Sequence, residues 1–177
     1  ASGMSVADIK SAALQMDEAA IADWTLPLFN KGLLRGDALA RYVSRQVQGR
    51  TLQDMKMPVG VLATDLATGK GVLFQRGDAA LAVRASSAVP GMFTPVEIGG
   101  RQYVDGGLVA PVPVEQARQM GAEVVIAVDI SSVPSSSEGG DALRVLLQTF
   151  TIMGQVINRY VLADADVVVR PALMGVG

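Results

Sequence analysis

The apolar residues of this chain occur partly in unbroken runs. Val59–Asp65 and Glu123–Ile130 are almost continuously apolar and rich in β-branched residues, and Val167–Val169 is a shorter run of the same kind. Such runs are typical of strands that are covered on both faces of a sheet. We therefore expect two buried strands, of which Glu123–Ile130 has the strongest pattern, and a last strand at Val167–Val169.

Two hairpins are predicted from turns that contain glycine. Thr68–Gly71 leads from the first apolar run into Val72–Gln75. Gly99-Gly100 separates Val96–Ile98 from Gln102–Val104. Because glycine adopts positive φ easily, a Gly-Gly pair between two such segments indicates a tight hairpin turn.

Elsewhere the apolar residues recur every three or four positions, which predicts amphipathic helices. The longest is expected from Leu143 to Tyr160, and Ser5 with Asp8 forms a capping-box pattern at the start of the first. We expect helices over residues 5–16, 36–49, 78–88, 113–120 and 143–160, and a short one before Pro27. Helices that alternate with buried strands indicate the α/β class with α/β/α layers.

The 177 residues suit one domain, which we assign to residues 1–177 with a polar loop over about 131–140.

The long helix, Leu143–Tyr160, has two interpretations. It covers a core, or it touches a lipid surface. Few of its residues are basic, so covering a core is favoured.

Composition excludes several classes of chemistry. The chain has no His and no Cys, which removes the Ser-His-Asp triad, thiol nucleophiles, disulfides and the usual zinc sites. Its 15 Lys+Arg and 17 Asp+Glu give a net charge of −2, and this balance argues against binding nucleic acid. Catalysis would have to use hydroxyls, carboxylates, Lys, Arg or backbone amides.

The mean hydropathy of +0.34 is high enough to raise the question of a membrane span. The longest uncharged stretch near the C-terminus, Val145–Asn158, is too short and too polar to cross a bilayer. No secretory leader is visible. Because the chain opens on Ala-Ser-Gly, with Gly3 resembling a helix stop, we expect it to be a fragment of a longer protein.

Asp105-Gly106-Gly107 follows the predicted strand Gln102–Val104. Taken alone, it is typical of a turn, since glycine supplies positive φ at little cost. It also suits a carboxylate base, because flanking residues without side chains let a nucleophile approach closely, as a weak base requires. The pattern alone leaves both interpretations open.

Six segments in order resemble the patatin-like phospholipase family of bacterial type, over nearly the whole chain. These segments are Lys31–Gly36, Val61–Leu66, Arg84–Phe93, Pro95-Val96, Tyr103–Val114 and Met120–Asp129. The resemblance implies a patatin-like α/β/α sandwich around a mostly parallel sheet. It also implies hydrolysis of phospholipid or lysophospholipid acyl esters by a Ser-Asp dyad, without metal or organic cofactor. In this resemblance Asp105 is the dyad base, within the motif Asp105-Gly106-Gly107.

The sequence departs from the family pattern at the nucleophile. The family has its serine in a Gly-x-Ser-x-Gly elbow after an oxyanion-hole loop, and the 177 residues contain no such elbow. The opening Ala1–Ser5 resembles the stretch just after it, so the elbow and the loop are expected upstream. Removal of an N-terminal strand would expose a sheet edge, so dimerisation or a further segment is expected to cover it.

Other hydroxyls and carboxylates are also candidate site residues. Ser86 and Ser87 could replace the nucleophile, but a helix C-terminal turn near Asp105 is favoured. Asp65 and Asp129 end predicted strands, where capping of the following turn is favoured over a catalytic role. The segment Gly69-Lys70-Gly71 lacks the spacing of a phosphate-binding loop and is interpreted as a hairpin turn.

The first functional hypothesis is that the parent protein is a serine acyl hydrolase of patatin type, acting on lipid esters at a membrane surface. A cytoplasmic or peripheral-membrane location and a homo-oligomer are compatible with it. The alternative is a non-catalytic patatin-like interaction or regulatory module. A nucleotide-binding α/β domain is disfavoured, because no glycine-rich turn follows a strand at the required spacing.

Overall fold

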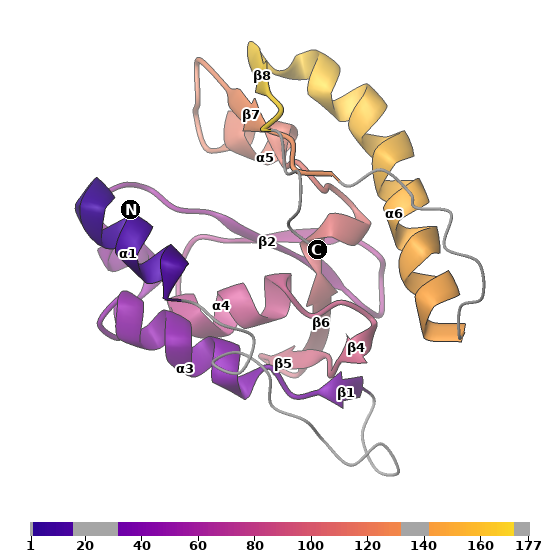
Figure 1. Ribbon diagram of the computed structural model, residues 1–177, viewed down its shortest axis with the longest axis horizontal. Helices are drawn as coiled ribbons and strands as arrows, with labels where there is room; N and C mark the ends of the chain where they lie inside the picture. The colour runs from indigo at the N-terminus through magenta and orange to yellow at the C-terminus, as the bar shows by residue number, and fades with distance from the viewer. Residues whose placement is uncertain (1, 16–31, 132–141, 172–177) are drawn as a thin grey trace. The chain divides into compact units, whose positions relative to one another are not determined.

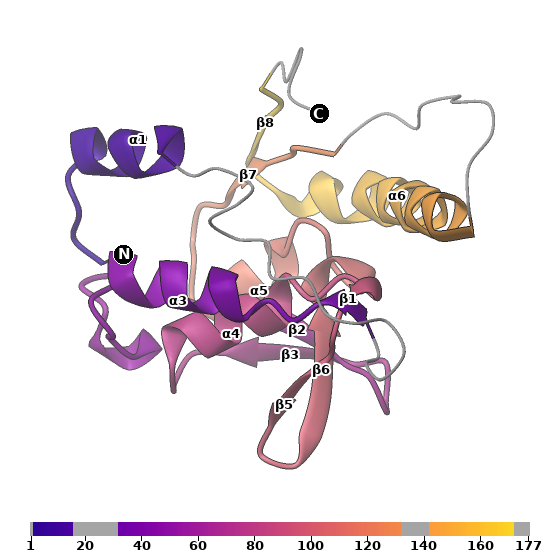
Figure 2. The same ribbon diagram turned by 60° about the horizontal axis from the view of Figure 1, so that its bottom comes forward.

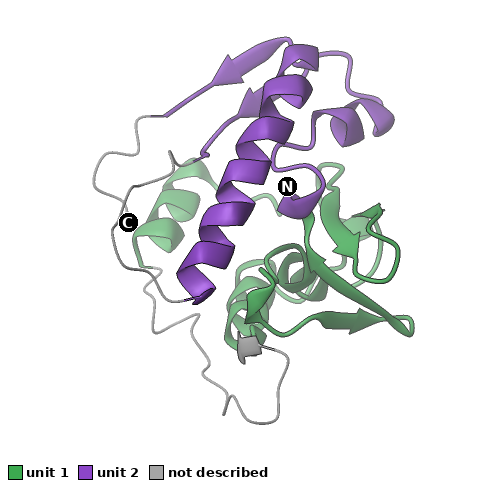
Figure 3. Cartoon of the chain, turned by 90° about the vertical axis from the view of Figure 1, so that its right-hand side faces the viewer, with its two compact units in different colours: residues 1–106 green, residues 107–177 purple. Residues whose placement is uncertain are grey.

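The computed structural model describes residues 2–15, 32–131 and 142–171. Figure 3 shows its two compact units, residues 1–106 and residues 107–177. We describe each unit by itself. The short helix expected before Pro27 and most of the loop expected over 131–140 lie outside the described residues.

The sheet of the first unit has four strands in the order β3-β2-β6-β5. Its strands are β2 (Val61–Asp65), β3 (Gly71–Phe74), β5 (Val96–Ile98) and β6 (Arg101–Asp105). Every pairing among them is antiparallel. Figure 2 shows the β5–β6 hairpin extending from the sheet.

The mixed α/β class is confirmed, but the expectation of a mostly parallel sheet needs correction for the described strands. The largest described sheet is antiparallel because tight turns join β2 to β3 and β5 to β6, and a tight turn can join only antiparallel neighbours. In the second turn Gly99 and Gly100 have φ of 59° and 76°, as a two-residue hairpin of this type requires. Both predicted hairpins are confirmed.

Helices α4 (Ala79–Ser86) and α3 (Asp37–Gln46) lie in successive layers on the sheet of this unit (Figure 1). The Asp78 carboxylate caps α4 by accepting a hydrogen bond from the Leu81 amide at 2.7 Å. Four alanines of α4 are buried, and their small side chains let the helix approach the strands closely: Ala79, Ala80, Ala82 and Ala85. Tyr103 packs edge-on against Phe74, with ring centroids 5.1 Å apart.

The remaining elements of the first unit are short. They are α1 (Val6–Leu14), β1 (Gly32–Leu34), η1 (Leu52–Asp54) and β4 (Gly91–Phe93), with β1 and β4 forming a parallel pair. The predicted capping box of α1 is present, since Ser5 Oγ accepts a hydrogen bond from the Asp8 amide at 3.1 Å and the Asp8 carboxylate accepts one from the Ser5 amide at 3.3 Å.

The second unit contains a parallel pair of strands and a long helix. Its elements are α5 (Val114–Gln119), β7 (Ile126–Val128), α6 (Ala142–Val161), η3 (Leu162–Asp164) and β8 (Val167–Val169), and η2 (Gly106–Leu108) spans the division between the units. Val114, Val125, Ala127 and Leu162 are buried together in its core. Helices α5 and α6 confirm the helices that were predicted over 113–120 and 143–160.

The expectation that Glu123–Ile130 is buried on both faces is wrong in this structure. The strand is shorter than expected, and its residues alternate between buried and exposed. Ile126 and Val128 are 64% and 54% exposed, whereas Ala127 between them is 3% exposed. Side chains alternate along a strand, and in the second unit the core covers only the face that Ala127 occupies.

Candidate functional site

Asp105 is the last residue of β6, and hydrogen bonds hold its backbone on both sides. Its amide donates to the Ala88 carbonyl at 3.0 Å. Its carbonyl accepts a hydrogen bond from Thr64 Oγ1 at 2.8 Å. Since Ala88 follows α4 and Thr64 lies in β2, two separate elements fix the backbone from which the carboxylate projects. The side chain is half-buried.

The residue opposite Asp105 on the neighbouring strand is small. Ala63 of β2 is directly opposite Asp105 and is completely buried. Opposite residues in an antiparallel pair project on the same face, and so do alternate residues of one strand. The Asp105 side chain therefore shares a face with Ala63 and with Tyr103, which belong to the core that also contains Ala85 of α4. A methyl group beside Asp105 leaves more room at its carboxylate than a longer side chain would.

Gly106 is required for a different reason from the one that the turn pattern suggested. Neither Gly106 nor Gly107 is among the described glycines with positive φ. Instead, a Cβ added to Gly106 would lie 2.2 Å from the Leu62 carbonyl oxygen and 2.8 Å from its carbon. Because these are backbone atoms of β2, no side-chain rotation can relieve the overlap. Gly106 thus lets the chain after Asp105 pass directly over the neighbouring strand.

Ser86 and Ser87 lie at the C-terminal end of α4, as predicted. Ser86 ends α4, and Ser87 is its C-cap residue, whose amide donates to the Val83 carbonyl at 3.0 Å. Both are half-buried. The next residue, Ala88, accepts the hydrogen bond from the Asp105 amide. The favoured interpretation, a helix C-terminal turn packed near Asp105, is confirmed.

Asp65 caps a turn, as expected. It ends β2 and is 1% exposed, and its Oδ1 accepts hydrogen bonds from the Ala67 and Thr68 amides, both at 3.0 Å. Its Oδ2 accepts a hydrogen bond from Arg101 Nε at 2.5 Å. The Arg101 contact is the main reason that the pKa of the Asp65 carboxyl lies below its ordinary value, although burial opposes the shift. A depressed pKa and a saturated set of partners suit a structural carboxylate.

Asp129 also caps a turn, within what we call the Asp129 cluster: Asp129, Ser131, Asn158 and Arg170. Asp129 Oδ1 accepts hydrogen bonds from the amide and the hydroxyl of Ser131, and its Oδ2 accepts one from Arg170 Nε at 3.2 Å. The Ser131 hydroxyl is the main cause that lowers the pKa of Asp129. Asn158 Nδ2 donates to Ser131 Oγ at 2.9 Å and so fixes α6 to the segment after β7.

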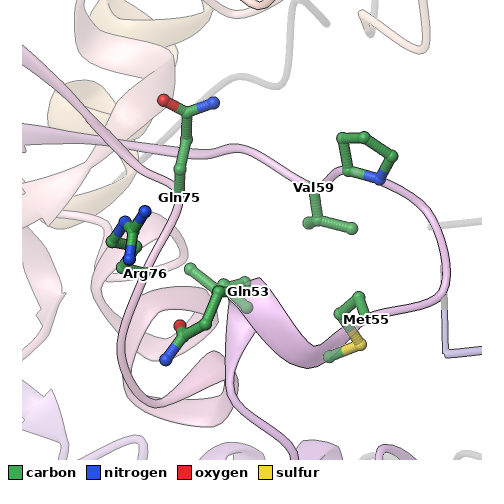
Figure 4. A pocket seen from close by; sticks show the side chains of 7 residues that line it. Gln53, Met55, Val59, Gln75 and Arg76 are labelled. Atoms are coloured by element: carbon green, nitrogen blue, oxygen red, sulfur yellow. The ribbon is translucent and has the colours of Figure 1, made fainter.

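One hollow of the first unit, about 360 Å³ in volume, lies between η1 and the segment after β3 (Figure 4). Its lining residues are Leu52, Gln53, Met55, Pro58, Val59, Gln75 and Arg76. Gln53 Oε1 accepts a hydrogen bond from the Gly77 amide at 2.9 Å and so connects the two sides. The lining includes no carboxylate, hydroxyl or thiol, so this hollow offers neither a nucleophile nor a general base.

Among residues 2–15, 32–131 and 142–171, no group of three or more Asp and Glu side chains is arranged to hold a metal ion. No described helix combines the length and apolar character that crossing a bilayer demands.

Sequence reasoning missed the residues that support Asp105 and the Asp129 cluster. Thr64 contacts the Asp105 carbonyl from another strand, and Arg101 reaches Asp65 across the sheet. Asn158 appeared only as one polar residue within an amphipathic helix, yet it is 4% exposed. No sequence signal set it apart, because Thr151 and Gln155 lie on the same side of that helix.

Comparison with known proteins points to one family. The family model described as "Patatin-like phospholipase" matches residues 1–118. An uncharacterized NTE family protein of Mycobacterium tuberculosis is 37% identical over 111 residues, which are 63% of this chain and 30% of that protein. Patatin-like phospholipase domain-containing protein 6 of Homo sapiens is 30% identical over 127 residues, 70% of this chain and 9% of that protein. The chain therefore spans less than a third of the length of these relatives.

Proposed function

Because this chain belongs to the patatin-like phospholipase family, we propose that the whole protein is a serine hydrolase of lipid acyl esters. Its substrates are phospholipids or lysophospholipids, and the reaction needs neither a metal nor an organic cofactor. We also propose that the two units are parts of one domain over residues 1–177, because the family match continues past residue 106, where the first unit ends.

Asp105 is the base of the proposed Ser-Asp dyad. The serine hydroxyl attacks the acyl carbonyl while Asp105 accepts its proton, and Asp105 then protonates the departing alcohol. Water hydrolyses the resulting acyl-serine by the same steps. A carboxylate is a weak base and must contact the serine directly, so its position has to be fixed. The observation that supports this role best is that two hydrogen bonds hold the Asp105 backbone, one donated by its amide to Ala88 and one accepted by its carbonyl from Thr64.

The nucleophile is supplied by the whole protein outside these 177 residues, which contain no Gly-x-Ser-x-Gly elbow. A serine and the oxyanion-hole donors each contribute a large part of the rate, and one donor typically supplies about 3–4 kcal/mol. The 177-residue chain alone is therefore expected to show no ester hydrolysis above background. Turnover by the purified chain, abolished by Asp105→Asn, would refute this and would indicate an internal nucleophile.

Covalent labelling of the whole protein by a fluorophosphonate tests the proposal. We expect one labelled serine, located by mass spectrometry in a Gly-x-Ser-x-Gly segment, and loss of labelling in Asp105→Asn. Glu97→Gln is the matched control, because it neutralises an exposed carboxylate on the neighbouring strand β5. A folded whole protein without any labelled serine would instead support the alternative function, a non-catalytic patatin-like interaction or regulatory module.

The proposed substrate also bears on location. A phospholipase must reach esters that lie in a membrane, so we propose a cytoplasmic or peripheral-membrane protein that contacts the membrane surface.

A further inference from the structure

The direction in which the Asp105 side chain leaves the sheet depends on the two peptide groups beside its Cα atom. Each peptide group is planar, so the rotations φ and ψ of Asp105 set the direction of its Cα–Cβ bond. The amide of Asp105 belongs to the first peptide group, and its carbonyl belongs to the second, which joins it to Gly106. A partner on each group therefore fixes both rotations and, with them, the point from which the carboxylate extends.

The first peptide group is held from the side of the sheet that the Asp105 side chain occupies. The Asp105 amide donates to the Ala88 carbonyl at 3.0 Å. Ala88 is 1% exposed and belongs to the same core as Ala63, which lies opposite Asp105 on β2. The acceptor of this hydrogen bond is thus packed in place. Because it is a backbone atom, a substitution at Ala88 would leave the acceptor present.

The second peptide group is held by a side chain, that of Thr64. Its Oγ1 donates to the Asp105 carbonyl at 2.8 Å. Thr64 follows Ala63 in β2, so the Thr64 side chain projects on the opposite face of the sheet from those of Ala63 and Asp105. The two hydrogen bonds therefore hold the Asp105 backbone from both faces of the sheet, and the one from Thr64 can be removed by substitution.

The sheet in turn holds Thr64 in place. Thr64 is paired with Gly71 of β3 on one side and with Val104 of β6 on the other. Strands on both sides fix its backbone, and branching at Cβ limits its side chain to few rotamers. The peptide group that it contacts needs such a partner, because Gly106 has no Cβ to restrict the backbone rotation after Asp105.

We propose that Thr64 is a positioning residue for the dyad, whose hydroxyl acts through the Asp105 backbone to keep the carboxylate in contact with the serine. The inference rests on the proposed function, in which Asp105 is the base. Since the hydroxyl contacts the carbonyl of Asp105, it takes no part in the proton transfer itself. Proton transfer needs direct contact, and a misplacement of about 1 Å can cost about 100-fold in rate.

Thr64→Val in the whole protein tests the proposal, because valine keeps the branched shape and removes the hydroxyl. With a water-soluble ester, we expect kcat to fall by about 10–100-fold while KM stays within about twofold, since the base is displaced and the substrate contacts are not. Thr64→Ala also lacks the hydroxyl and should show the same division between kcat and KM. Circular dichroism at the assay temperature shows that each variant is folded.

Two further variants show whether the hydroxyl is responsible. Thr64→Ser keeps the hydroxyl and should keep kcat within about threefold of the unaltered protein. Thr149→Val is the matched control, because Thr149 Oγ1 also donates to a backbone carbonyl at 2.8 Å, that of Val145 within α6. This substitution removes an equivalent hydrogen bond and should leave kcat unchanged.

Combining Thr64→Val with Asp105→Asn separates positioning from a general loss of structure. When the carboxylate is already absent, there is no base to displace. Adding Thr64→Val to Asp105→Asn should therefore change the residual kcat by less than about threefold. A merely structural role of Thr64 would instead lower kcat by the same factor with and without the Asp105 carboxylate.

Three results would overturn the proposal. The first is a kcat within about threefold of the unaltered value for folded Thr64→Val and Thr64→Ala. The second is a raised KM with unchanged kcat, which would place Thr64 in substrate binding. The third is an equal loss in both backgrounds of the combined experiment. Failure of the proposed function is read separately, from an unchanged kcat in Asp105→Asn alone.

Discussion

Replacing Gly106 by alanine tests how the segment after Asp105 is held. The new Cβ would lie 2.2 Å from the Leu62 carbonyl oxygen, far inside the distance at which two such atoms touch. Both atoms are attached to backbone, so β6 and β2 must separate locally. That movement strains the hydrogen bond from Thr64 Oγ1 to the Asp105 carbonyl, now 2.8 Å. Overpacking of this kind costs about 1–3 kcal/mol, and the strained hydrogen bond adds about 1 kcal/mol.

We therefore expect Gly106→Ala to lower the free energy of unfolding by about 3 kcal/mol, or the melting temperature by about 6–12 °C for a chain of this size. Urea and thermal unfolding followed by circular dichroism measure both. Gly69→Ala is the control, because its Cβ would meet nothing within 4 Å and only its φ of 68° is unfavourable. That substitution should cost about 1 kcal/mol. A loss below about 0.5 kcal/mol for Gly106→Ala would refute the close approach.

Two further predictions concern stability, and one concerns chemistry. Hydrogen bonds hold the pKa of Asp65 and of Asp129 below the ordinary value of 3.8. The stability that these two carboxylates confer should therefore be complete above that pH and be lost as pH falls through their lowered pKa values. Unchanged stability in an acid titration from about pH 5 to about pH 2 would contradict this. Asn158→Asp should destabilise the chain more than Asn158→Ala, because it would bring a buried carboxylate near Asp129; equal urea midpoints would contradict that. Finally, the 177-residue chain should hydrolyse p-nitrophenyl esters no faster than buffer, and a rate above background that requires Asp105 would point to another nucleophile.

Local chemistry was sufficient to predict many of the elements. Ser5 and Asp8 indicated the start of α1, and Gly99-Gly100 indicated the β5–β6 turn, because in each case the residues that determine the geometry are neighbours in sequence. The motif Asp105-Gly106-Gly107 correctly indicated the end of a strand. The catalytic role proposed for it rests on the resemblance to a family and not on the three residues.

Features that depend on distant partners were not predictable from the chain alone. The requirement for Gly106 comes from Leu62, a residue on another strand, so a turn preference was the wrong explanation for it. Arg101 and Asp65 form their ion pair across 36 positions of sequence. The segment Glu123–Ile130 was predicted to be buried because it is apolar. An apolar composition does not show whether another element covers that face of the strand.

The role of Asp105 is tested most directly by the turnover of a water-soluble ester by the whole protein. We predict that Asp105→Asn lowers kcat by about 10³-fold or more while the protein stays folded, because the serine of the proposed dyad loses the base that accepts its proton. Glu97→Gln should keep the unaltered rate. A folded Asp105→Asn protein whose kcat stays within about threefold of the unaltered protein would contradict the assignment of Asp105 as the base.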